Sequence, residues 1–198
     1  MTYTPQDFSK LLGTKGFSDR LLQNHFKLYQ GYVTNTNKLV ETFTAMSKEG
    51  KTATPEFAEL KRRFGWEFNG MRLHELYFGN MNKDKKNLAP NSHLMKKMVE
   101  TFGSGEECEK AFIATGTMRG IGWVIMYYDP LGKKLFNTWI NEHDVGHLAG
   151  AVPLIIMDVF EHAFMVDYDT NKADYIKAFL AAIDWEIVEK RYAAAMKA

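Results

Sequence analysis

The segment PLIIMDVFEHAFMVDY, residues Pro153–Tyr168, sets Asp158, Glu161 and His162 into one of the longest apolar runs of the chain. Such a run is typical of a buried core. Burying a carboxylate without a partner costs several kcal/mol, and an uncompensated charge costs more. The pattern therefore predicts a buried strand, AVPLIIMD, whose end carries a carboxylate with a compensating partner.

Two further runs precede this strand, where the helical period of the sequence ends. GWVIMYYD and KKLFNTWIN are separated by the turn residues DPLG, which predicts a β-hairpin. Together with AVPLIIMD they form an expected three-stranded antiparallel sheet. After the sheet we expect one amphipathic helix through ADYIKAFLAAIDWEIVEKRY, residues 173–192.

The N-terminal half has helical periodicity throughout. Ser18 is a plausible N-cap of a long first helix, and Thr54 followed by Pro55 predicts the start of a second. The sequence thus predicts an α+β fold, with a helical N-terminal hairpin domain at residues 1–89 and a mixed domain at residues 90–198 that holds the three-stranded antiparallel sheet.

Composition limits the classes of partner. The 198 residues carry a formal net charge of +1 without a basic block, so neither nucleic acid nor a membrane surface is implied. Cys108 is the one cysteine, which excludes an internal disulfide. The first residues lack the pattern of a secretory signal, and a cytoplasmic location is the default expectation.

Three histidines and one aspartate point to a metal. His25 and His74 stand on the apolar faces of the expected helices, while Asp158 and His162 lie in the apolar run. Three imidazoles and one carboxylate form a complete ligand set for a transition metal with one position left for solvent or substrate. Hydrogen-bonded core histidines are the alternative, and spacing alone leaves both open.

The loop NEHDVGHLAG contains a competing pattern. His143, Asp144 and His147 imitate the HExxH motif of zinc hydrolases, which needs a helix to bring both histidines onto one face. Gly146 and Gly150 instead predict a loop between two strands. Against a hydrolase site, a polar loop with surface histidines is the stronger alternative.

Several motifs, in the same order along the chain, resemble those of the iron/manganese superoxide dismutases. The residues from Asp158 to Ala163 are similar to the family signature Asp-x-Trp-Glu-His-Ala, and HELYF from His74 is similar to a second ligand motif. GYVTNTN, GIGWV and DWEIVEKRY resemble three more. The fold known for that family agrees with the organisation expected above, and the departures mark a divergent member.

The resemblance implies one iron or manganese ion per chain, held by His25, His74, Asp158 and His162. It implies dismutation of superoxide to dioxygen and hydrogen peroxide, and a homodimer or a dimer of dimers. The alternative function is a dismutase-like metal-binding protein whose site is structural or sensory, with little activity.

The resemblance also assigns roles around the metal. Tyr32 would gate the pocket and Trp123 would form a wall, with strand packing as the alternative for Trp123. Glu161 would bridge to the partner subunit's His162, or be a plain surface glutamate. We further expect His143 to donate a hydrogen bond to solvent on the metal, against the alternative of an exposed loop histidine.

Some positions depart from the family pattern. His25 stands one residue closer to Tyr32 than the family's first ligand stands to its tyrosine, so a gapless alignment would place Asn24 at the ligand position. Asparagine is a poor ligand here, and we favour His25 with a one-residue deletion in the helix. Tyr29 occupies a position where the family often has histidine, and Phe160 replaces the usual tryptophan.

Overall fold

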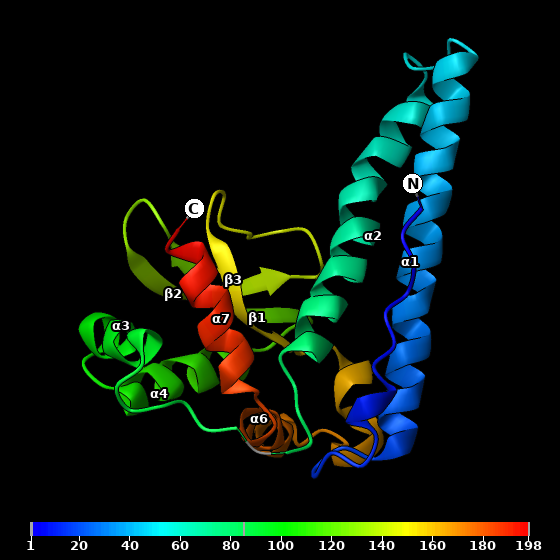
Figure 1. The fold of residues 1–198 in the computed structure, drawn as a ribbon. Helices are drawn as coiled ribbons and strands as arrows, with labels where there is room; N and C mark the ends of the chain where they lie inside the picture. The colour runs from blue at the N-terminus through cyan, green and yellow to red at the C-terminus, as the bar shows by residue number, and fades with distance from the viewer. Residues whose placement is uncertain (1, 85, 198) are drawn as a thin grey trace.

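The computed structural model describes residues 2–84 and 86–197. Its N-terminal part is a short 3-10 helix, η1 (Ser9–Leu11), and two long antiparallel helices, α1 (Asp19–Lys48) and α2 (Pro55–Gly79). The distal ends of α1 and α2 project beyond the rest of the molecule as a helical hairpin (Figure 1).

The remaining elements form the mixed part of the α+β fold, which confirms the predicted class. The sheet is antiparallel with the order β2-β1-β3, so the first strand lies in the middle. In chain order the elements are α3 (His93–Phe102), α4 (Gly105–Gly116), β1 (Gly122–Asp129), β2 (Lys134–Asn141), β3 (Val152–Asp158), η2 (Glu161–Ala163), α5 (Met165–Tyr168), α6 (Lys172–Ala181) and α7 (Trp185–Ala195). The predicted boundary at residue 89 falls between α2 and α3 and stays a prediction.

The two long helices begin where their capping residues predict. The Ser18 hydroxyl accepts a hydrogen bond from the Leu21 N–H at 3.1 Å, and Thr54 accepts one from the Phe57 N–H at 3.3 Å. Each cap satisfies one of the first N–H groups, which have no partner within the helix. Helix α1 then runs outward to the tip of the hairpin, and α2 returns from the tip to the level of the sheet (Figure 1).

Strand β1 needs glycine at its first residue. Gly122 has φ +144°, and a Cβ there would lie 2.0 Å from the Ile140 carbonyl oxygen. The close approach sets the register in which Trp123 stands opposite Ile140 of β2 and Asp158 of β3. Asp158, the carboxylate predicted at the end of β3, thereby lies beside Trp123 at the start of β1.

A second glycine permits close packing between α1 and α2. Gly70 lies inside α2, where glycine destabilises a helix by about 0.5–1 kcal/mol relative to alanine. A Cβ at Gly70 would lie 2.5 Å from the ring of Tyr32 on α1. The glycine therefore makes room for this aromatic ring one helical turn before His74.

The prediction of a single C-terminal helix is wrong, because the segment forms α6 and α7 with a break at residues 182–184. In the break the Asp184 N–H donates to the Asn80 carbonyl at 2.9 Å, and the Ala182 carbonyl accepts from the Asn82 N–H at 2.8 Å. The Asp184 carboxylate then caps α7. Hydrogen bonds between residues 182–184 and the segment after α2 therefore break the helix, although the helical periodicity of the sequence continues through this point.

In the described part of the chain, no helix is both long and apolar enough to span a membrane.

Candidate metal centre

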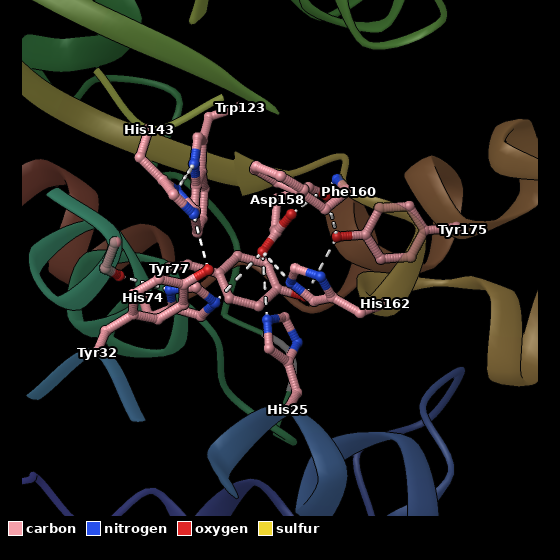
Figure 2. A network of polar contacts seen from close by, with 11 residues as sticks. His25, Tyr32, His74, Tyr77, Trp123, His143, Asp158, Phe160, His162 and Tyr175 are labelled. Carbon is pink, nitrogen blue, oxygen red and sulfur yellow. Dashed lines mark hydrogen bonds and ion pairs between the residues drawn. The ribbon is translucent and has the colours of Figure 1, made fainter. Parts of the chain in front are cut away.

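Four side chains from four elements converge at the junction of the helical hairpin and the sheet (Figure 2). Their candidate ligand atoms all lie within 4.8 Å of one another. The four residues are His25 on α1, His74 on α2, Asp158 at the end of β3 and His162 in η2.

Asp158 is the centre of this cluster. Its Oδ2 lies 3.2 Å from the Nε2 of His25, 3.2 Å from that of His162 and 3.6 Å from that of His74. Its Oδ1 accepts a hydrogen bond from the Phe160 N–H at 2.8 Å. Burial alone would raise the pKa of Asp158, but the charge of His162 and the hydrogen bonds from His162 and His25 hold that pKa below its usual range. The carboxylate is therefore ionised.

His74 is oriented as a metal ligand. Its Nδ1–H donates to the Gly70 carbonyl at 2.5 Å, which leaves the lone pair on Nε2. This Nε2 is buried and has no hydrogen-bond partner among the described residues. Burial and the neighbouring His25 lower the pKa of His74 well below its ordinary value. A neutral imidazole with an unpartnered acceptor beside a carboxylate fits a bound cation.

The geometry supports His25 over Asn24 as the ligand on α1. His25 is 1% exposed and faces Asp158, whereas Asn24 is exposed. Helix α1 is regular across this region, so the one-residue shift places the imidazole rather than the amide toward the cluster.

His143 is fully buried, which excludes the alternative of an exposed loop histidine at this position. Its Nδ1 accepts a hydrogen bond from the Trp123 Nε1–H at 3.0 Å. The proton must then reside on Nε2, which lies 2.9 Å from the Tyr32 hydroxyl and donates to it. Tyr32 in turn stacks on His74, with ring centroids 5.2 Å apart.

The zinc-hydrolase pattern is not formed. His143 and His147 lie in the irregular segment between β2 and β3, as expected, and Gly146 has φ +106°. The two histidines therefore do not share a helical face.

Aromatic rings enclose the cluster. Phe160 stacks between His143 and His162, with interplanar angles of 23° and 25° and centroid distances of 4.8 and 5.3 Å. Trp123 meets His74 edge to face at 5.0 Å. Trp123 is at once a buried residue of β1 and a wall of the cluster, so its two proposed roles do not exclude each other.

Comparison with known proteins is consistent with this geometry. A model of the iron/manganese superoxide dismutases, C-terminal domain, matches residues 90–191. A protein of Aquifex pyrophilus named superoxide dismutase [Fe] is 34% identical, over 98% of this chain and 92% of its own. The chain belongs to the iron/manganese superoxide dismutase family.

Relatives named for either metal match this family member. A Haloferax volcanii protein named superoxide dismutase [Mn] 2 is 30% identical over 89% of this chain and 87% of its own. A Cupriavidus metallidurans protein named superoxide dismutase [Fe] is 32% identical over 92% and 91%. One ion of iron or manganese is the cofactor that the comparisons and the ligand cluster support.

Tyr29 joins a polar network beside the cluster that the sequence did not predict. Its hydroxyl donates to Glu75 Oε1 at 3.0 Å and accepts from the Gln6 N–H at 2.9 Å. Glu75 is buried and also pairs with Arg72. A carboxylate immediately after His74 on a largely buried helix face was the available signal.

The contact of Tyr175 with the metal centre was also not predicted from the sequence. Its hydroxyl donates to the Asp158 carbonyl at 2.6 Å and lies 3.2 Å from the Tyr77 hydroxyl. It anchors the end of β3 from α6, a contact between residues 17 positions apart. Its apolar position in an amphipathic helix is equally typical of a plain core residue, so no distinct signal marks its contact with Asp158.

The ligand assignment on α1 yields a prediction for metal content. We expect His25→Ala to lose most of the bound metal, because it removes one buried donor, while Asn24→Ala retains it, because that side chain is exposed. Elemental analysis of both purified variants beside the wild type measures this. Metal loss in Asn24→Ala with retention in His25→Ala would contradict the assignment.

Proposed function

We propose that this protein is a superoxide dismutase that converts superoxide to dioxygen and hydrogen peroxide at a single iron or manganese ion. The observation that carries the proposal is the buried cluster of three imidazoles and one ionised carboxylate, in which the Nε2 of His74 has no hydrogen-bond partner within residues 2–84 and 86–197. Family membership supports the same reaction.

His25, His74, Asp158 and His162 would hold the ion. When bound, it supplies redox chemistry: one superoxide gives up an electron and leaves as dioxygen, and a second superoxide receives it. The ionised Asp158 offsets part of the ion's charge, and the neutral His25 and His74 need release no proton to bind it.

Reduction of superoxide to hydrogen peroxide consumes two protons, and we assign their delivery or orientation to the hydrogen-bonded pair of Tyr32 and His143. Burial raises the pKa of Tyr32, so its hydroxyl stays protonated. Burial lowers the pKa of His143 to about 4, so its imidazole is neutral at neutral pH. Because His143 donates to the Tyr32 oxygen, the proton of Tyr32 is free to point toward another acceptor in the pocket.

A superoxide-consumption assay tests the function. We expect protein loaded with iron or with manganese to accelerate superoxide loss, and Asp158→Ala to lose both stoichiometric metal and activity. Full metal occupancy without activity in the wild type would favour the structural or sensory alternative. Metal retained in Asp158→Ala would remove this residue from the ligand set.

The role of His143 gives a second prediction. Its Nε2–H donates to Tyr32 and its Nδ1 accepts from Trp123, and His143 is not one of the four candidate metal ligands. We therefore expect His143→Gln to leave metal content intact while changing activity and the ratio of activities of the iron and manganese forms. Unchanged activity with both metals would contradict the role.

We also propose a homodimer whose interface lies beside the metal centre. Glu161 is exposed and precedes His162, whose side chain is 26% exposed. Met165 and Val166, a few residues on, are 41% and 43% exposed. The Glu161 carboxylate, the partly exposed His162 and these two apolar side chains form a surface that a second copy of the chain would cover.

For this interface we expect Glu161→Ala to weaken both association and activity, since the carboxylate would orient the imidazole of the partner's His162. Sedimentation velocity measures the association, and the superoxide assay measures the activity. A fully active wild type that stays monomeric at micromolar concentration would argue against the interface.

A further inference from the structure

His143 is carried by a tight turn between β2 and β3. The turn is closed by two hydrogen bonds between Asn141 and Val145, whose N···O distances are 2.8 and 3.3 Å. Glu142 adopts φ +52°, a left-handed conformation that residues with a Cβ rarely adopt. This turn directs His143 inward and Glu142 outward. Such a conformation persists only where surrounding contacts hold it.

Trp66 on α2 contacts both of these residues. Its Nε1–H donates to Glu142 Oε2 at 2.9 Å, and its ring meets the imidazole of His143 edge to face with centroids 4.5 Å apart. On the same tryptophan, the Arg63 guanidinium lies 3.9 Å from the ring centroid. Arg63 also forms an ion pair with the buried Glu67 at 2.8 Å. Trp66 is thus a fixed support for the turn.

His147 holds the backbone of the same turn from the sheet side. Its Nδ1 lies 2.7 Å from the Tyr127 hydroxyl of β1, and its Nε2 lies 2.9 Å from the His143 carbonyl oxygen. Because a carbonyl can only accept, Nε2 carries the proton and Nδ1 accepts from Tyr127. The second histidine of the hydrolase-like pattern therefore links β1 to His143.

We propose that Trp66, Glu142 and His147 are positioning residues that hold the imidazole of His143 on Tyr32. The hydrogen bond from Trp66 to Glu142 ties the turn to α2, and the contact of His147 with Tyr127 ties it to β1. The inference rests on the proposed function, because His143 acts there through Tyr32. A purely structural role would stabilise the loop without affecting the environment of the bound ion.

Paired variants of the metal-loaded protein test the proposal. Glu142→Ala removes the acceptor for the indole N–H, whereas Glu142→Gln keeps an acceptor oxygen. Trp66→Phe keeps a ring beside His143 but loses the N–H. His147→Phe removes the donor to the His143 carbonyl, and His147→Gln keeps one. Asp144→Ala is the matched control, because Asp144 is exposed, carries the same charge and lies in the same turn.

We expect Glu142→Ala and His147→Phe to lower superoxide turnover by about tenfold at unchanged metal content, the smaller end of what lost outer partners of metal sites cost. The midpoint potential of the bound ion should shift and hydrogen exchange of residues 142–147 should accelerate. Trp66→Phe should show the same changes more weakly. Glu142→Gln, His147→Gln and Asp144→Ala should stay near wild type in all three measurements.

The measurements separate this inference from the proposed function. If the wild type binds metal but consumes no superoxide, the function fails, and a shifted potential in Glu142→Ala still supports positioning. Should Glu142→Ala and His147→Phe match Asp144→Ala in potential and exchange, the positioning role is overturned. The same holds if exchange accelerates while the potential stays fixed. Where Glu142→Ala or His147→Phe fails to fold, Trp66→Phe decides in its place.

Discussion

The ionised carboxylate of Asp158 imposes the main constraint on this structure. It is fully buried, and three imidazoles are its nearest charged or chargeable neighbours. Desolvation of an isolated carboxylate would be too costly for a stable domain. The surrounding elements therefore have to bring compensating groups to one point, and α1, α2, β3 and η2 each supply one residue of the cluster. The convergence of helical hairpin and sheet follows from that requirement.

Local features of this convergence could be predicted from sequence. The caps at Ser18 and Thr54, the antiparallel sheet and the ligand cluster are marked by nearby residue types and by ordered motifs. Features that depend on contacts between distant segments could not. The helix break at Asp184 arises from pairing with Asn80, and no local breaker residue marks it.

The inward position of His143 was implied by the family resemblance and has no local signal, for the same reason. In sequence it stands between charged residues near two glycines, which is typical of an exposed loop. The indoles that enclose it come from α2 and β1, namely Trp66 and Trp123. A histidine whose partners are so distant in sequence has no local signal of its buried state, and only the fold places the three rings together.

The packing at Gly70 also explains why the donor to Tyr32 comes from a loop. Gly70 precedes His74 by one helical turn, so a side chain there would point toward the same pocket. The Tyr32 ring already fills that space, since a Cβ at Gly70 would lie 2.5 Å from it. Helix α2 therefore cannot supply a hydrogen-bonding side chain at this level. The turn between β2 and β3 supplies His143 instead, and the placement of that imidazole depends on whatever holds the turn.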